Sequence, residues 1–115
     1  MPRLDPLRSN ALTIREATAD DVPLILELIK ELAAYEKLTH EVVATETDLA
    51  RTLFGERRHA EVLLGFEDQH AVAFALYYHN YSTFLGRPGL YLEDLFVRNE
   101  TRGRGIGEAM LKRLA

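Results

Sequence analysis

Two periodicities of apolar and polar residues divide the chain into predicted strands and helices. Residues 12–17 alternate apolar and polar side chains, which predicts a half-buried strand. Apolar residues then recur at helical spacing from Val22 to Leu32, and the pattern fades over residues 34–37. Thr18 or Asp20 could cap this helix, and we favour Asp20, because Pro23 would then fall in the first turn, where proline is tolerated.

A local capping signal predicts a second, shorter helix. Thr45 is followed three residues later by Asp48, which resembles a capping box, in which each side chain binds the backbone N–H of the other residue. Leu49 and Leu53 supply the apolar face of this helix, and Gly55 ends it.

The middle of the chain predicts a hairpin. A polar loop is expected over residues 54–59, followed by strands over 60–66 and 71–79 that are rich in aliphatic and aromatic residues. The polar link between them, residues 67–70, is short, which favours an antiparallel pairing.

The last third of the chain predicts one more strand and one more helix. Residues 80–89 hold two glycines and a proline and are expected to form a turn-rich loop. A third strand, antiparallel to the second, is predicted over residues 90–97. A helix follows the glycine-rich residues 102–107, and its predicted buried face carries four apolar residues: Ile106, Met110, Leu111 and Leu114.

The predicted order of elements is β-α-α-β-β-β-α, which places the chain in the α/β class, in its α+β form. Residues 1–11 hold Pro2 and Pro6 and are predicted to be a flexible leader. The remaining residues, 12–115, are predicted to form one domain with a mostly antiparallel, mixed sheet.

Composition narrows the classes of function. The chain has 115 residues, 47% of them hydrophobic, and no cysteine, so disulfides and thiolate chemistry are excluded. The longest apolar run is too short for a membrane span, and no secretory signal is visible. Charge is unevenly placed: residues 1–97 hold 9 basic and 16 acidic residues, whereas residues 98–115 hold 5 basic and 2 acidic ones. Such a split could serve a cationic ligand in one place and an anionic one in another, but the charges alone favour an ordinary solvated surface.

The sharpest chemical signal is R-G-R-G-I-G at residues 102–107, between a strand and an amphipathic helix. Glycine lets an anion approach the backbone closely, and free N–H groups at a helix N-terminus bind phosphate oxygens. Arg102 and Arg104 could add charged contacts. The spacing matches neither the Walker loop nor the dinucleotide-binding fingerprint. The glycines alone are equally compatible with a flexible turn, but their position favours phosphate.

Two acidic positions are the other candidates for chemistry. Glu93 and Asp94 interrupt an otherwise apolar strand, and because neighbouring strand residues face opposite sides, at least one carboxylate should face the core or a cleft. Burial would raise its pKa toward the range of a general base. From the residues alone, a strand end with one exposed carboxylate and one salt bridge is the simpler interpretation. Tyr35 and Glu36 could equally be a packed helix end beside a surface charge.

Other candidate ligands carry no assignment. The strand tyrosines are interpreted as ordinary packing, and no metal is expected, because the four histidines show no metal-ligand spacing: His40, His59, His70 and His79.

These motifs resemble the GNAT superfamily of acetyl-CoA-dependent N-acetyltransferases. R-G-R-G-I-G fits the superfamily signature R/Q-x-x-G-x-G/A. The similarity is closer still to the diamine (spermidine/spermine) and thialysine N-acetyltransferase group. It is carried by I-R-E-A-T from residue 14, L-I-K-E-L-A-A-Y-E from residue 28, Y-Y at 77–78 and Y-L-E-D-L-F-V from residue 91.

The resemblance implies a cofactor, a substrate and a role for each matched position. The cofactor would be acetyl-CoA, with no metal, and the substrate a primary amine of a polyamine, diamine or lysine-like small molecule. Glu93 would be the catalytic base, which an ammonium group needs before its nitrogen can attack. The implied amine-binding residues are Tyr35, Glu36, Glu93 and Asp94. The implied cofactor-binding residues are Leu95, Phe96 and Val97, whose backbone would pair with the pantetheine arm, and Arg102, Gly103, Arg104, Gly105, Ile106 and Gly107, which would hold the pyrophosphate.

The chain also departs from this family. Members continue for roughly another third of a domain, which supplies a further strand, the closing part of the sheet and a tyrosine that protonates the leaving thiolate. No tyrosine follows Tyr91 here, so the chain matches only the N-terminal two-thirds of the fold. We expect it to be part of a longer domain, to lack catalytic competence alone, and to leave its last helix short of packing.

Further expectations concern partners, location and alternatives. The resemblance implies a cytoplasmic homodimer. We expect no nucleic-acid partner, because one short basic segment in a net-acidic chain is a narrow footprint, and no membrane partner. The alternative to an enzyme is a non-catalytic module that binds a coenzyme A-like anion or pairs with partner chains through an exposed strand edge.

Overall fold

The computed structural model describes residues 11–115, so the predicted leader lies almost entirely outside the described residues. The elements follow the predicted order. They are β1 (Leu12–Glu16), α2 (Val22–Tyr35), α3 (Glu46–Phe54), β2 (Glu61–Glu67), β3 (His70–Ser82), β4 (Arg87–Val97) and α4 (Ile106–Leu114). Three short 3-10 turns accompany them: η1 (Ala19–Asp21), η2 (Thr39–Glu41) and η3 (Asn99–Thr101).

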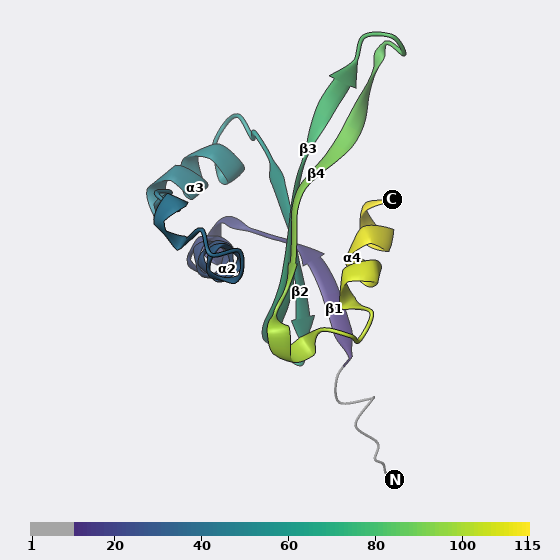
Figure 1. Ribbon diagram of the computed structural model, residues 1–115. Helices are drawn as coiled ribbons and strands as arrows, with labels where there is room; N and C mark the ends of the chain where they lie inside the picture. The colour runs from purple at the N-terminus through teal and green to yellow at the C-terminus, as the bar shows by residue number, and fades with distance from the viewer. Residues whose placement is uncertain (1–10) are drawn as a thin grey trace.

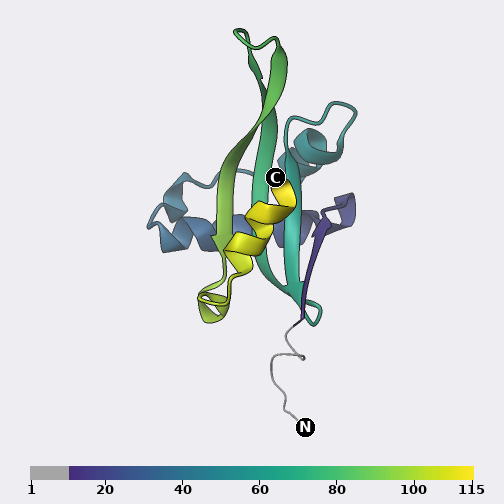
Figure 2. The ribbon, with the colours of Figure 1, turned by 90° about the vertical axis from the view of Figure 1, so that its right-hand side faces the viewer.

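The four strands form one sheet in the order β1-β2-β3-β4, which Figure 2 shows face-on behind α4. Every pairing among the described strands is antiparallel, so the parallel pairing expected of a mixed sheet is not among them. Helices α2 and α3 cover one face of the sheet and α4 covers the other (Figure 1). β4 is therefore an edge strand that continues into the glycine-rich loop.

Each face of the sheet has its own apolar core. The core under α2 and α3 is the larger, and its fully buried side chains include Ile25, Leu28, Leu64 and Phe74. The core under α4 is built from Leu63, Val72, Ala73, Ala75, Tyr77, Ile106 and Met110. Because neighbouring strand residues point to opposite faces, the near-continuous apolar runs of β2 and β3 are what a sheet covered on both sides requires.

The predicted capping box of α3 is confirmed. The Asp48 backbone N–H donates to Thr45 Oγ1 (3.1 Å), and the Thr45 N–H donates to Asp48 Oδ2 (3.0 Å). The predicted Asp20 cap of α2 is wrong. The turn η1 comes before α2 and is capped by Thr18, whose N–H donates to Asp21 Oδ2 (2.7 Å). Pro23 still falls in the first turn of α2.

The predicted loop over residues 80–89 is also wrong for most of its length. β3 and β4 continue as a two-stranded ribbon that projects beyond the helices (Figure 1), and Ser82 pairs with Arg87 at its tip. Only residues 83–86 form the turn, where Gly86 supplies a positive φ of 69°. Pro88 lies in the edge strand, where a missing N–H costs no sheet hydrogen bond if it faces outward.

The last helix is buried along part of its predicted face. Ile106 and Met110 are buried, and Met110 is 0% exposed. Leu111, predicted to be on the same face, is 46% exposed, because α4 lies on the sheet along a narrow stripe and Leu111 falls beside it. The shortage of packing expected for this helix is therefore confined to its C-terminal half.

Candidate functional site

A β-bulge places the two candidate carboxylates at an irregular point of β4. Asp94 pairs with Leu76 and Leu92 pairs with Tyr77, so Glu93 has no partner of its own in β3. A bulge bends its strand and redirects side chains, and bulges are frequent beside active sites. Sequence reasoning expected the two carboxylates to differ in environment, and the bulge is the local reason that they do.

Asp94 is the more buried of the two carboxylates. Its side chain is half-buried, and this burial raises the pKa of Asp94 above the usual carboxyl range. The negative charges of Glu93 and Glu36 raise it further. Glu93 is exposed. The site therefore gathers three carboxylates from α2 and β4 whose mutual repulsion would be relieved by a cation.

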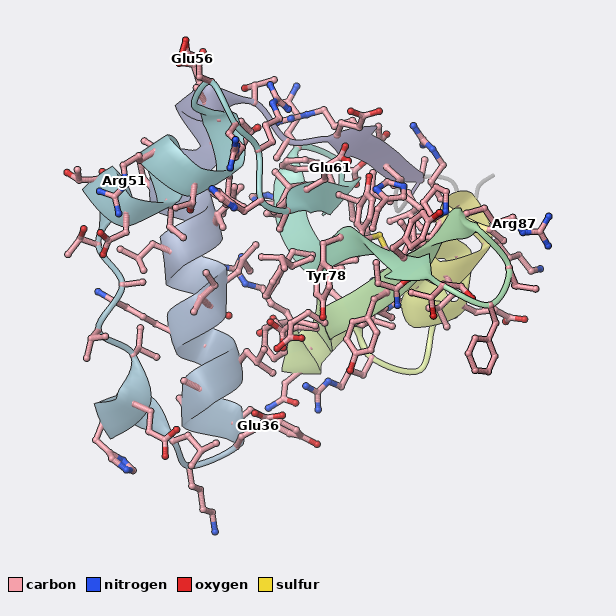
Figure 3. All side chains as sticks on the ribbon, turned by 90° about the horizontal axis from the view of Figure 1, so that it is seen from above. Glu36, Arg51, Glu56, Glu61, Tyr78 and Arg87 are labelled. Carbon is pink, nitrogen blue, oxygen red and sulfur yellow. The ribbon has the colours of Figure 1, made fainter. Side chains whose placement is uncertain are left out.

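The end of α2 brings the other two predicted amine-binding residues to this side of the sheet. Glu36 follows the last turn of α2, and Figure 3, viewed from above, shows it at the end of the helix on the side of β4. Tyr35, which the resemblance implied as an amine-binding residue, contacts Arg102 of the glycine-rich loop. Its ring, 58% exposed, lies under the guanidinium of Arg102, 4.1 Å from ring centroid to Cζ.

An aromatic pair lies next to the bulge and was not assigned from the sequence. The rings of Tyr78 and Tyr91, which pair across β3 and β4, have centroids 5.1 Å apart. Tyr78 is labelled in Figure 3. The sequence favoured ordinary strand packing for these tyrosines, and the only signal for their contact would have been the strand register. Tyr91 precedes Glu93 by two residues and Asp94 by three, so the two rings lie close to the carboxylates along β4.

The predicted pantetheine strand has an open edge. Within residues 11–115, β4 pairs with β3 alone, so the other edge of Leu95, Phe96 and Val97 offers backbone groups for an extended ligand. The side chains of these residues hold the strand in place: Phe96 is buried under α2, whereas Leu95 and Val97 pack toward α4. The Val97 carbonyl already accepts a hydrogen bond from Arg102 Nε (2.8 Å).

The glycine-rich loop exposes its backbone at the start of α4. Gly103 and Gly105 have φ of 86° and 77°, and a Cβ on either would meet no atom within 4 Å. The first helical bond runs from the Ala109 N–H to the Gly105 carbonyl (3.0 Å), which leaves the preceding N–H groups of the helix start without helical acceptors. Gly107 faces β4, since a Cβ there would lie 3.8 Å from Val97 Cγ2. The loop and the open edge of β4 therefore adjoin.

The arginines around this loop are engaged with protein groups. Arg98 donates to both oxygens of Glu31 (2.9 and 2.7 Å), to Glu27 and to the Ala71 carbonyl (2.8 Å). These carboxylates raise the pKa of Arg98 above its usual value, chiefly through the hydrogen bonds that Arg98 donates to Glu31. Arg104 Nη1 donates to Glu67 Oε1 (2.8 Å). The sequence could not reveal these pairs, because the partners are 37 to 71 residues apart.

Comparison with known proteins assigns the family. The profile of the acetyltransferase (GNAT) family matches residues 25–115, which include every candidate residue of the site. The chain belongs to the GNAT acetyltransferase family. The GNAT fold predicted from the sequence is thereby confirmed.

Curated relatives of this GNAT chain fall in the predicted group. A thialysine N-epsilon-acetyltransferase of Bos taurus is 43% identical over 110 residues, which is 89% of this chain and 64% of that protein. A human spermidine/spermine N(1)-acetyltransferase-like protein 1 is also 43% identical, over 89% of this chain and 16% of its own length. The chain spans slightly less than two-thirds of the thialysine acetyltransferases that it matches.

Solved structures confirm the GNAT fold. An acetyltransferase of Clostridium acetobutylicum, solved with acetyl-CoA, superposes with a TM-score of 0.73 at 20% identity, over 90% of this chain and 71% of the other. At that identity the likeness shows the fold of the GNAT chain and does not transfer a substrate.

The residues of this GNAT chain fit the coenzyme that its family uses. Open backbone N–H groups and positive-φ glycines at a helix start suit a pyrophosphate, and the free edge of β4 suits an amide-bearing arm. Among residues 11–115, no group of histidine, aspartate and glutamate side chains is arranged to hold a metal ion. Within the same residues, no helix is both long and apolar enough to cross a membrane.

Proposed function

We propose that this chain forms the coenzyme-binding and amine-binding part of an acetyl-CoA-dependent N-acetyltransferase. The acceptor would be a primary amine of a polyamine, a diamine or a lysine-like small molecule. The observation that carries the proposal is the layout of β4. One strand bears the carboxylates at its bulge, has a free edge at residues 95–97, and continues into the glycine-rich loop.

The carboxylates at the bulge of β4, together with Glu36, would bind and deprotonate the amine. Glu36 and Asp94 supply negative charge that attracts an alkylammonium group. Glu93 would take one proton from the ammonium, directly or through a water molecule, and so leave a nitrogen lone pair free to attack. A second ammonium group on the same molecule would be held by the remaining carboxylates, which favours diamines over monoamines.

The last residues of β4 and the glycine-rich loop that follows them would position the acetyl donor. Acetyl-CoA supplies the acetyl group as a thioester when bound. The backbone of Leu95, Phe96 and Val97 would orient the donor's amide-bearing arm, and the N–H groups of residues 103–108 would bind its pyrophosphate. No tyrosine of this chain follows Tyr91, so the group that returns a proton to the leaving thiolate is not assigned to it.

The proposal is tested by steady-state acetyl transfer with the full-length protein that contains this chain. Glu93→Gln should lower kcat by about 100-fold or more, the usual contribution of a positioned base, with little change in coenzyme binding. Glu56→Gln, a matched neutralisation at a residue that Figure 3 shows beyond the opposite end of α2 from Glu36, should leave both unchanged. Unaltered turnover in Glu93→Gln would refute the assignment of the base.

Substrate class is tested with a series of amines at fixed coenzyme concentration. Spermidine, a diamine and a lysine-like amine should each have a lower KM than a monoamine of equal length, because only they can engage two carboxylates. Asp94→Asn should raise the KM of the diamines and leave that of the monoamine nearly unchanged. Equal specificity for monoamines and diamines would exclude the proposed substrate class.

We further propose, on the resemblance to the diamine and thialysine acetyltransferases, that the whole protein is a homodimer located in the cytoplasm. Light scattering after size-exclusion chromatography measures the first, and fractionation of the source cells measures the second. A monomer at micromolar concentration would contradict the proposed assembly without affecting the proposed chemistry.

A further inference from the structure

The glycine-rich loop has almost no internal support. Before it, the Arg102 N–H donates to the Asn99 carbonyl (3.2 Å), and after it the helical bonds begin at the Gly105 carbonyl. Among the described residues, no backbone hydrogen bond is made by Gly103 or Arg104 in between. Gly103 and Gly105, on either side of Arg104, adopt a positive φ with open space around them. Glycine populates positive and negative φ about equally, so these residues do not fix the backbone conformation themselves. The shape of this loop must therefore be fixed from outside.

The Arg104 side chain supplies the external contact. Its Nη1 donates to Glu67 Oε1 at 2.8 Å, across 37 residues of sequence. Glu67 is the last residue of β2 and is only 8% exposed, a burial that is rare for a glutamate without a partner. Arg104 is the cation with which it forms an ion pair among the described residues. Because Glu67 belongs to a paired strand, the contact ties a loose loop to a rigid element.

The neighbouring anchor shows the same design. Arg98, which follows β4, donates to the Ala71 carbonyl through its side chain and to the Val72 carbonyl through its backbone N–H (both 2.8 Å). The end of β2 and the start of β3 therefore hold the segment that follows β4 at two points, one on each side of η3. A groove of about 600 Å³ lies between these points and is lined by Arg98, Thr101, Arg104 and Glu67 among others.

This geometry determines how much of the positive charge of Arg104 is available to a ligand. The carboxylate of Glu67 neutralises Arg104 and orients its guanidinium toward the end of β2. A cation already paired with a buried carboxylate attracts an approaching anion weakly, so the backbone N–H groups and the positive end of α4 remain the main anion-binding elements. The sequence interpretation, in which Arg104 itself holds the pyrophosphate, is an alternative with the opposite consequence for Glu67.

We infer that Glu67 is a positioning residue for the coenzyme-binding loop, and that Arg104 is its anchor rather than a phosphate ligand. This inference rests on the proposed coenzyme-binding function of the loop. Glu67 touches neither substrate nor coenzyme and acts only through Arg104. It explains why a buried acidic residue stands beside an anion site, where its charge alone would oppose binding.

Coenzyme titration of the full-length protein separates the two interpretations, because they predict opposite changes in the affinity for coenzyme A. If Arg104 is an anchor, Glu67→Gln weakens coenzyme A binding by about tenfold, the scale of one ionic hydrogen bond. If Arg104 is a direct ligand, Glu67→Gln frees it and removes a repelling charge, so binding tightens. Asp68→Asn, in the same turn, measures the effect of charge alone and should tighten binding slightly. Tighter binding in Glu67→Gln would overturn the inference.

A double-mutant cycle adds a second criterion. Arg104→Gln should weaken binding as much as Glu67→Gln, and the double variant should be no weaker than either single one, because both remove the same contact. Additive effects would show that Arg104 contacts the coenzyme independently. The KM of acetyl-CoA should rise in all three variants while kcat stays within about twofold, the split expected when a binding interaction is lost.

Hydrogen exchange of the unliganded protein tests the anchor without any coenzyme. The amides of residues 103–108 should exchange faster in Glu67→Gln and Arg104→Gln than in the wild type, whereas those of β2 and β3 should keep their protection. Unchanged exchange at the loop would refute the anchor. If the wild type fails to bind coenzyme A, the proposed function fails, and the exchange result still decides whether Glu67 fixes the loop.

Discussion

The stretch from the bulge of β4 to the glycine-rich loop carries opposite charges at its two ends, and the ends differ in whether those charges are available. At the bulge, Glu93, Asp94 and Glu36 repel one another, and burial disfavours the charge on Asp94. At the loop, each arginine is engaged: Arg98 with Glu27 and Glu31, Arg102 with Val97 and Tyr35, and Arg104 with Glu67. The acidic end can therefore recognise a cation with its side chains, whereas the basic end must recognise an anion largely with its backbone.

This difference shows that a sequence counts charges but does not show which of them are free. Residues 98–115 have an excess of basic residues, which suggested an anion site made of side chains. Three of those five basic residues, Arg98, Arg102 and Arg104, instead make contacts that hold the end of β4 and the loop after it in place. The anion-binding capacity that remains comes from Gly103, Gly105 and the start of α4, which carry no charge in the sequence.

The largest expected effect comes from a negative charge placed at the backbone site. Gly105→Asp should weaken coenzyme A binding at least about 100-fold, because its carboxylate would occupy the positive end of α4 and repel the pyrophosphate. Gly105→Asn is the matched control, since asparagine tolerates a positive φ and is nearly the same size. It should weaken binding only a fewfold by isothermal titration. Equal losses in both variants would assign the effect to strain and undo the comparison.

A smaller effect is expected on stability from the loop's other anchor. Arg98→Met should lower the free energy of unfolding by about 2 kcal/mol, because it leaves Glu31 and the Ala71 carbonyl without their donor in a partly buried place. The control is Arg51→Met, which removes an exposed 3.5 Å ion pair with Asp48 and should cost less than about 0.5 kcal/mol. Urea unfolding measures both. Equal costs would mean that Arg98 is not an anchor.

The smallest expected effect is a dependence on pH at the acidic end. The raised pKa of Asp94 means that the folded protein holds this proton more tightly than the unfolded chain, so stability falls as pH rises through the raised value. Asp94→Asn removes this loss, so its stability relative to wild type should increase as pH rises from the unfolded pKa of an aspartate through the raised folded pKa.

Asp21 supplies the opposite control for that measurement. The hydrogen bond from Arg15 holds the pKa of Asp21 below its usual value, so its contribution to stability is present above the unfolded pKa and is lost as pH falls. Asp21→Asn should therefore lose stability relative to wild type as pH rises from the lowered folded pKa up to the unfolded value, which is a lower pH range than that of Asp94. Parallel trends in the two variants, followed by thermal unfolding, would contradict the difference in their environments.

Local patterns predicted much of the fold. The capping box at Thr45 and Asp48 depends on four consecutive residues, so its chemistry is visible in the sequence and was confirmed. The order of elements was predicted by apolar periodicity and by turns. The ribbon over residues 80–89 was missed because glycine and proline mark turns and also tolerate an edge strand, and the choice depends on pairing between β3 and β4.

For the candidate site, sequence reasoning named residues but not their contacts. Glu36, Glu93 and Asp94 do lie near one another at the bulge of β4, but this bulge arises from the register with β3, which no short motif encodes. The pairs Arg98–Glu31 and Arg104–Glu67 join residues 67 and 37 positions apart. Such pairs are determined by the folded arrangement, and the roles assigned to the site residues stay predictions until the variants are measured.

The chain order of the sheet bears on how the protein is made. β2, β3 and β4 form a meander in which each strand pairs with its neighbour in sequence, and such local pairings close at a low entropic cost. The partners of Arg98 and Arg104 are Glu27, Glu31, Glu67, Ala71 and Val72, and all of them precede the glycine-rich loop in the chain. During synthesis from the N-terminus, the platform can therefore assemble before residue 102 leaves the ribosome. The loop then settles onto a surface that is already formed.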